Sequence, residues 1–254
     1  MPGVVTTAAS GRAAEAEELS ARFGLRAEAR AGRTLRQVIE DARGEPVLVL
    51  AARRADLYER GRAFRATAGM AFLRVLRVSK GETDPLIAAA ALRAGDRVLD
   101  ATLGLGGDAL VAAHATGTAV VGIESDGLLA AFTQAGLRRL AGHGRDPGGR
   151  IEVVRGDHRL FLRTQADGSF DVVLLDPMFR RSGDSGPNFE LLRAHAEHAP
   201  LASDTLSEAR RVARRGVLVK DAAPGLELRR LGLVPKPSRR SAAIVLGWAA
   251  SLVK

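Results

Sequence analysis

The stretch 98–108, VLDATLGLGGD, constrains the fold of this chain more than any other. It reads as an apolar strand, Val98-Leu99, that ends on Asp100 and enters a loop with glycines at 104, 106 and 107. Gly104 and Gly106 can take positive φ values, and Gly107 lets the following helix pack closely on the strand. Free backbone N–H groups at the start of that helix can then face a ligand. The stretch therefore predicts a strand-loop-helix unit that holds a nucleotide.

Strands and helices alternate through the residues that follow this unit. The apolar patterns predict strands over 97–100, 119–123, 151–154 and 170–175, with helices between them over 107–115, 127–140 and 158–164. Such alternation is typical of a parallel sheet with right-handed crossovers. The uninterrupted apolar run 172–175 suits a strand that is covered on both faces.

The predicted sheet has signals at both of its ends. Asp84-Pro85 starts a helix, with Asp as N-cap and Pro in the first turn, and Gly95 ends it. Further along, a helix from Ser203 to Arg215 ends at Gly216, a strand follows over 217–219, and the segments 233–234 and 242–248 read as a strand pair. We therefore expect an α/β fold over residues 81–254, with a doubly wound, mostly parallel Rossmann-like sheet and an antiparallel C-terminal strand.

Residues 1–80 predict a small N-terminal α/β lobe and a connector. Strands are expected over 4–7 and 47–50, helices over 15–23 and from Thr34, which has Gln37 as its capping-box partner, and a hairpin over 53–65. In a helix over 69–78, Phe72, Leu73 and Leu76 share one face. Arg74 and Arg77 share another, which is either a solvated side or an edge that contacts phosphate.

The composition admits a nucleic-acid partner without demanding one. A formal net charge of +9 attracts phosphate, yet only four of the 38 basic residues are lysines, so the arginine excess also reads as compositional bias. The absence of cysteine excludes disulfides, thiolate nucleophiles and cysteine-based zinc sites. His158, His195 and His198 lack a third ligand at suitable spacing, so we expect no metal.

No stretch of the sequence indicates secretion or a membrane anchor. The N-terminus lacks the basic and apolar regions of a signal peptide, and the longest apolar run, 242–253, is too short to span a bilayer. We expect a cytoplasmic protein.

Four acidic residues stand at or just beyond the ends of successive predicted strands, namely Asp100, Glu124, Asp157 and Asp176. In an open parallel sheet, the carboxyl ends of the strands form the edge where ligands bind. The first three suit a cofactor that carries adenosine, with Asp100 near its amino-acid portion, Glu124 on the ribose and Asp157 on the adenine amine. Asp157 fits equally well as a helix N-cap. The fourth carboxylate faces the substrate.

The segment Asp176-Pro177-Met178-Phe179 suits the binding of a planar amine. A carboxylate oxygen and the Pro177 carbonyl offer two acceptors for an exocyclic NH2 group, while Phe179 stacks on the ring that carries it. Accepting the protons of such a weakly nucleophilic amine, and holding it in line with a methyl group, raises its reactivity. The segment therefore predicts methyl transfer from S-adenosylmethionine, against the simpler reading of a turn with Phe179 in the core.

These motifs resemble those of the class I S-adenosylmethionine-dependent methyltransferases. More closely, DATLGLGGD at 100–108, DPMF at 176–179 and VLVK at 217–220 are similar to the RsmJ-type 16S ribosomal RNA guanine-N2 methyltransferases. The resemblance implies that Gly104, Gly106 and Asp108 hold the cofactor and that residues 176–179 hold the target amine. The chain departs from that pattern at Gly107, where the family has Arg, and at Arg180, where it has a second Pro.

The motifs and the resemblance together define the candidate site. The expected cofactor contacts are Asp100, Thr102, Gly104, Gly106, Gly107, Asp108, Glu124, Ser125, Asp157 and His158. The expected RNA, from 16S ribosomal RNA or a small-subunit particle, would meet Arg74, Arg77, Arg180, Arg181 and Lys220. The alternatives are an ordinary solvated loop for Arg180 and Arg181 and pairing with an acid for Lys220. Three alternatives remain: a methyltransferase for another base amine or a protein amide, an NAD(P)-dependent oxidoreductase, and a noncatalytic RNA-binding module.

Overall fold

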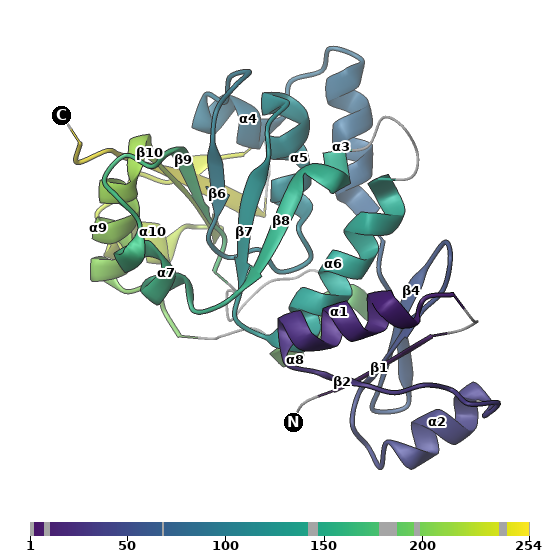
Figure 1. The fold of residues 1–254 in the computed structure, drawn as a ribbon. Coiled ribbons are helices and arrows are strands. Elements are labelled where there is room, and N and C mark those ends of the chain that lie inside the picture. Colours follow the sequence, from purple (N-terminus) through teal and green to yellow (C-terminus); the bar gives the residue numbers. More distant parts are fainter. Residues whose placement is uncertain are drawn as a thin grey trace.

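Two β-sheets make up the core of the molecule, which we describe from a computed structural model (Figure 1). The structure describes residues 3–7, 11–67, 69–141, 147–177, 187–195, 199–238 and 243–253. The N-terminal sheet and its helices lie at one side of the larger sheet, next to α6 (Gly127–Ala141). Within the described residues, no helix is long and apolar enough to cross a membrane.

The N-terminal sheet has the strand order β2-β1-β3-β4-β5. Its parallel part comprises β1 (Val4–Thr7), β2 (Arg26–Ala27) and β3 (Val47–Leu50), and the hairpin β4 (Ala55–Glu59) and β5 (Arg62–Arg65) continues it antiparallel. Two helices, α1 (Ala13–Phe23) and α2 (Leu35–Asp41), belong to this part. The capping box predicted for α2 is confirmed, because Gln37 N–H donates to Thr34 Oγ1 (3.2 Å) and Thr34 N–H donates to Gln37 Oε1 (2.7 Å).

The larger sheet has the order β11-β12-β10-β9-β6-β7-β8. Its strands are β6 (Val98–Asp100), β7 (Val120–Glu124), β8 (Ile151–Arg155), β9 (Phe170–Leu175), β10 (Ala213–Ala222), β11 (Lys236–Pro237) and β12 (Ile244–Ala250). Five adjacent strands are parallel, in the order β10, β9, β6, β7 and β8. The strand β12 runs antiparallel to β10 and to β11. The predicted mostly parallel sheet with an antiparallel C-terminal strand is confirmed.

Helices cover both faces of this sheet. On one face lie α3 (Gly69–Ser79), α4 (Pro85–Ala90), α5 (Gly107–Thr116) and α6, and on the other lie α7 (His158–Thr164), α9 (Ser203–Val212) and α10 (Leu226–Arg230). The core on the first face is continuous with that of the N-terminal sheet, because Phe132 of α6 shares one cluster with Phe23, Leu48 and Leu57. A separate cluster on the second face includes Val173 and Leu206.

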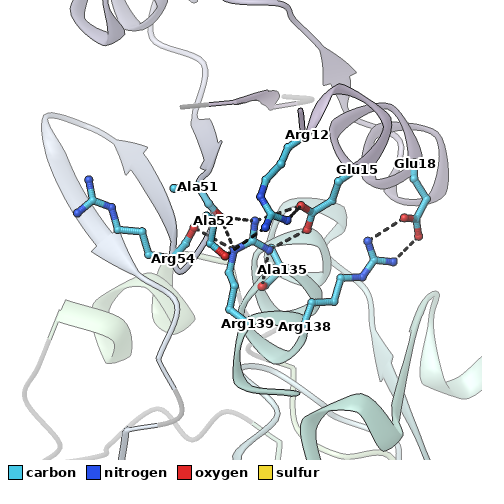
Figure 2. A network of polar contacts seen from close by, with 9 residues as sticks. All are labelled: Arg12, Glu15, Glu18, Ala51, Ala52, Arg54, Ala135, Arg138 and Arg139. Carbon is cyan, nitrogen blue, oxygen red and sulfur yellow. Dashed lines mark hydrogen bonds and ion pairs between the residues drawn. The ribbon is translucent and has the colours of Figure 1, made fainter. Parts of the chain in front are cut away.

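A network of polar contacts joins the N-terminal part to α6 (Figure 2). The Arg139 guanidinium, only 6% exposed, donates to Glu15 of α1 (2.8 and 3.2 Å) and to the carbonyls of Ala51 and Arg54. Arg138, one residue earlier and 32% exposed, pairs with Glu18 of α1. The two cations therefore tie the same pair of helices together in different environments.

The structure corrects several predicted boundaries. The helix from Ser203 ends at Val212 rather than Arg215, because Ala213 already pairs with Phe170 of β9. Gly216 lies inside β10, where an added Cβ would come within 2.4 Å of the Ala249 carbonyl oxygen. It is required by the close approach of β12 and does not terminate a helix.

Two other predictions are wrong in detail, and the apolar face predicted for α3 is exposed. The helix from Pro85 ends at Ala90, well before Gly95, and Leu92 N–H closes its last turn on the Ile87 carbonyl. The C-terminal pair is formed by β11 and β12 and omits residues 233–234. In α3 the buried residues are Ala71 and Val75, whereas the predicted apolar face, Phe72, Leu73 and Leu76, is 38–46% exposed.

Candidate functional site

A cavity of about 460 Å³ opens at the carboxyl ends of the parallel strands. Its size lies within the range of about 300–1,000 Å³ that is usual for small-molecule sites. Its wall includes four charged residues at or near these strand ends, namely Asp100, Glu124, Asp176 and Lys220. The loop after β6 contributes Thr102 and Gly104, and the start of α5 contributes Gly107 and Asp108. Sequence segments far apart in the chain therefore meet at the predicted edge of the sheet.

The loop after β6 is held to β9 as well as to its own strand. Thr102 N–H donates to Asp100 Oδ1 (3.2 Å), and the Thr102 hydroxyl accepts from Asp176 N–H (2.6 Å). Gly104 and Gly106 have φ values of 52° and 74°, the left-handed region that favours glycine. Asp100 is almost fully buried, and burial, with Asp108 nearby, raises its pKa to about 8. Thr102 thus links the two segments that the sequence singled out.

Glu124 is presented to the cavity by two backbone donors. Gly104 N–H binds its Oε2 (3.1 Å) and Asp126 N–H binds its Oε1 (2.9 Å), while Ser125 Oγ lies 3.4 Å from Oε1. Burial raises the pKa of Glu124, and these N–H groups offset part of that rise. Each carboxylate oxygen has two lone pairs, so Glu124 keeps capacity to accept from a ligand.

Asp157 is the N-cap of α7. Its Oδ1 accepts from Arg159 N–H (2.7 Å), and the Arg159 guanidinium binds both carboxylate oxygens. The hydrogen bond from Arg159 is the main reason that the pKa of Asp157 falls to about 2. Its neighbours Gly156, His158 and Arg159 line the cavity. Of the two roles open for Asp157 in the sequence, the structure shows the cap.

Arg74 and Lys220 were candidates for contact with RNA, with a solvated position as the alternative for Arg74 and an acidic partner as the alternative for Lys220. Both are bound to carboxylates inside the molecule. Arg74 donates to both oxygens of Asp84 (2.8 and 2.9 Å) and to Asp108 Oδ1 (2.7 Å). Lys220 Nζ donates to Asp108 Oδ2 (2.7 Å) and to Asp176 Oδ2. Both oxygens of Asp108 therefore face cations, which lower its pKa to about 2 against the effect of burial.

The remaining predicted residues divide into two groups. Arg77 is exposed on α3, and Ser125 and His158 line the cavity. Met178, Phe179, Arg180, Arg181 and His198 lie outside the described residues.

The helix α8 (Pro187–His195) is part of the cavity wall, and the sequence did not lead us to expect it there. Leu192 lines the cavity, and an added Cβ on Gly104 would lie 3.1 Å from its Cδ2 atom. His195 stands between Asp126 (3.1 Å) and Glu59 of β4 (2.9 Å). The adjacent leucines 191 and 192 after Pro187 were the available signal for a helix here.

The chain matches the model of a protein family described as "Putative SAM-dependent methyltransferase" over residues 36–230. The chain belongs to this family. S-adenosylmethionine is accordingly its cofactor. Family membership removes the oxidoreductase alternative.

Known relatives agree with this family. The chain is 34% identical over 217 residues to the uncharacterized protein YpiP of Bacillus subtilis strain 168, covering 81% of this chain and 82% of that protein. It is 31% identical over 171 residues to the ribosomal RNA small subunit methyltransferase J of Hydrogenovibrio crunogenus, covering 63% of this chain and 60% of that protein. The methyltransferase of the same name from Alteromonas mediterranea is 29% identical over 145 residues, 55% of this chain and 56% of that protein.

A solved structure shows the same fold. The S-adenosylmethionine-dependent methyltransferase NGO1261 from Neisseria gonorrhoeae aligns with a TM-score of 0.65 and 20% sequence identity. The alignment covers 99% of this chain and 97% of that chain, so both sheets are included.

The cavity fits the cofactor of the family in its donor set as well as its size. Glu124 presents an oriented carboxylate to the cavity, the kind of group that can accept from a diol, and Ile123 and Leu129 form apolar wall next to it. Gly107 begins α5 on the wall, where the positive end of a helix dipole favours a negatively charged group such as a carboxylate.

Proposed function

We propose that this methyltransferase modifies an exocyclic amine of an RNA base, namely N2 of a guanine in small-subunit ribosomal RNA. The observation that carries the proposal is the position of Asp176. It follows β9 directly, lines the cavity with Pro177 and is tied through its N–H group to Thr102 of the cofactor loop. A carboxylate at this place can accept from an amine that is held next to the cofactor.

Eight of the ten residues proposed as cofactor contacts line this cavity, and Gly106 and Asp157 do not. Glu124 would accept from the ribose hydroxyls, and the loop from Thr102 to Gly107 would surround the rest of the molecule, with Ser125 and His158 completing the wall. Asp108 would act through the cations that it binds rather than through a free carboxylate. When bound, the cofactor supplies an electrophilic methyl group.

With respect to the described residues, Asp176 keeps one oxygen for the target amine. Its Oδ2 receives Lys220, and no described residue donates to its Oδ1. An N–H of the amine that points at Oδ1 would turn the nitrogen lone pair away from the ring, which increases its reactivity toward a methyl group. The related ribosomal RNA methyltransferases support RNA as the substrate class, and RNA would place the protein in the cytoplasm.

The test uses ribosomal RNA and small subunits from cells that lack the protein. Purified protein and isotopically labelled S-adenosylmethionine are added, the RNA is digested to nucleosides, and the labelled nucleoside is identified by mass spectrometry. We expect N2-methylguanosine. N6-methyladenosine would overturn only the choice of base, whereas a methyl on ribose, on a ring carbon or on ribosomal protein would overturn the role of Asp176.

The variant Asp176→Asn separates chemistry from binding. Because Asp176 acts on the amine, the variant should bind S-adenosylhomocysteine almost as the natural protein does, with turnover lower by about a hundredfold or more. Calorimetry and the nucleoside assay measure the two quantities independently. Equal losses of both would assign Asp176 to cofactor binding instead.

A further inference from the structure

A row of five charged side chains begins on one wall of the cavity, and all of them except Asp84 line that wall. In order of contact it runs Asp84, Arg74, Asp108, Lys220 and Asp176, and each neighbouring pair is joined by a hydrogen-bonded ion pair. Asp84 caps α4, Arg74 lies on α3 and Asp108 on α5, while Lys220 and Asp176 stand on neighbouring strand ends. Five elements of the fold therefore combine at the group that faces the substrate.

We infer that Lys220 is a positioning residue, which holds Asp176 as an ionised acceptor for the target amine and is itself anchored by Asp108. The inference rests on the proposed function, because it assigns Lys220 a role through Asp176. The sequence left Lys220 open between pairing with an acid and contact with RNA, and this role follows the first of these.

The sheet itself brings Lys220 to Asp176. Val219 of β10 pairs with Leu175 of β9 in the parallel ladder, so the next residue on each strand, Lys220 and Asp176, emerges at the same edge. The lysine ammonium has three donors. Two of them reach Asp108 Oδ2 (2.7 Å) and Asp176 Oδ2, which fixes the direction of the remaining Asp176 oxygen.

Asp108 keeps Lys220 in place because the Asp108 carboxylate binds Arg74 as well as Lys220. Oδ1 of Asp108 accepts from Arg74. The other two guanidinium nitrogens of Arg74 form a bidentate contact with the Asp84 carboxylate. Asp84 is also fixed, because it accepts from Leu86 N–H as the N-cap of α4. Lys220 is thus attached to a rigid support, and its side chain is only 21% exposed.

The charges around Asp176 explain why a cation is needed there. Asp100 and Asp108 are both acidic neighbours of Asp176, and burial already raises the pKa of Asp176. Lys220 and Arg74 are the cations that oppose this rise, and Lys220 is the one in direct contact. Burial lowers the pKa of Lys220, but Asp108 and Asp176 together raise it above its ordinary value, so Lys220 keeps its charge.

The state of Asp176 decides what it can do for an amine. As a carboxylate it accepts an N–H from the base and can take the proton that the nitrogen gives up after methylation, while the N–H electron pair stays on nitrogen. If Oδ1 of Asp176 is protonated, that oxygen neither accepts the N–H of the base nor takes its proton. Lys220 keeps all three of its protons throughout this step.

The first test measures the two groups by NMR, with no RNA present. The chain has four lysines, so a sample with 15N-labelled lysine gives few signals, and Lys220→Arg assigns one of them. We expect hydrogen-exchange-protected ammonium protons for Lys220 but not for Lys236, which is exposed. In a sample with 13C-labelled aspartate, assigned with Asp176→Asn, the Asp176 carboxyl signal should be that of the ionised form at pH 7. A protonated Asp176 in the natural protein at pH 7 would overturn the inference.

The second test compares pH profiles of turnover. Lys220→Met should move the acidic limb of the kcat profile up by at least one pH unit and lower kcat at pH 7 at least tenfold, with partial recovery at pH 9. Asp108→Asn keeps an oxygen that can accept from Lys220 but removes a negative neighbour of Asp176, so it should move the same limb down. Lys220→Arg should restore most of the activity, and Lys236→Met is the matched control.

The outcomes separate the two proposals. If Lys220→Met leaves the acidic limb and the Asp176 signal unchanged, Lys220 does not act through Asp176. If the natural protein methylates no base amine, the proposed function fails, while the NMR measurement still decides the Lys220–Asp176 pair. Binding of S-adenosylhomocysteine to each variant by calorimetry shows whether the cavity remains intact.

Discussion

At the scale of single residues, the four carboxylates along the sheet edge have the same chemistry but four environments. Asp100 is buried beside other acids, so its pKa rises, whereas Asp157 is bound by Arg159 and its pKa falls. Glu124 is held by backbone N–H groups, and Asp176 is bound by a lysine. Their roles therefore follow from their partners and not from their positions at the ends of strands.

A pair of variants tests this division between Glu124 and Asp157. Glu124→Gln should weaken binding of S-adenosylhomocysteine by about 1–3 kcal/mol, because charge-assisted hydrogen bonds to the ribose are lost. Asp157→Ala should cost about 1 kcal/mol of unfolding free energy through loss of the cap and change the affinity much less. Calorimetry and urea unfolding give the two quantities. A larger loss of affinity in Asp157→Ala than in Glu124→Gln would return Asp157 to the adenine.

At the scale of elements, α8 is the helix that connects the cavity to the N-terminal hairpin. Leu192 lies beside Gly104 on the cavity wall, and Arg62 of β5 pairs with Glu190. His195 at the end of α8 binds Asp126, which follows β7, and Glu59 of β4. The hydrogen bond to Asp126, together with Glu59, raises the pKa of His195 to about 9 although burial opposes it.

This pKa predicts a pH-dependent contribution to stability. Because the pKa of His195 in the folded protein lies above its unfolded value of about 6.5, the folded state binds more protons between these values. The contribution is therefore complete below pH 6.5 and is lost as the pH rises to about 9. We expect about 1–2 kcal/mol between pH 6 and pH 9.5, reduced from the full linkage value by partial solvent exposure.

Urea unfolding at both pH values, for the natural protein and for His195→Gln, isolates this contribution. The variant should lose the difference, and its hydrogen exchange in α8 should be fast at both pH values. His114→Gln is the control, because His114 lies on α5 and hydrogen-bonds to the Ser79 hydroxyl (3.1 Å). The assignment fails if His195→Gln retains the full pH dependence.

At the scale of the whole molecule, the two sheets are joined by a shared hydrophobic core and by the contacts of Arg138 and Arg139 with α1 (Figure 2). The core cluster crosses the division at residue 80 that the sequence suggested, and the separation of residues 1–80 from 81–254 as domains stays a prediction. Arg138 and Arg139 lie in different environments, so replacing each one measures what its ion pair contributes to the contact between α6 and the N-terminal part.

Replacing each arginine by methionine compares a buried with an exposed ion pair. Arg139→Met removes the donors to Glu15 and to the backbone carbonyls of the N-terminal part, which should cost about 3 kcal/mol of unfolding free energy. Arg138→Met breaks an exposed pair and should cost at most about 1 kcal/mol. Urea unfolding with matched m-values measures both. Similar losses of unfolding free energy in the two variants would show that the burial of Arg139 adds nothing to the stability of the contact between α6 and the N-terminal part.

Much of the larger sheet follows from local signals. The apolar runs ending in Asp100, Glu124 and Asp176 are short and continuous, and helix starts such as Asp84-Pro85 and Thr34 depend on residues within one turn. Such local patterns predict the elements correctly because the apolar residues that form them are buried in the folded protein. The place of the cavity followed as well, since the carboxyl ends of parallel strands must meet at one edge.

The boundaries and charge partners depend on contacts between distant parts of the chain. The stretch 203–215 has a helical pattern throughout, yet pairing of Ala213 with Phe170 turns its end into strand. Arg74, Asp108, Lys220 and Asp176 are separated by 34, 112 and 44 residues at their three contacts, so no local spacing relates them. Burial at a shared edge leaves each charge to be balanced by whichever opposite charge the fold brings near. For this reason the sequence locates the carboxylates, and only the tertiary structure decides which are protonated, which are paired and which remain open to a ligand.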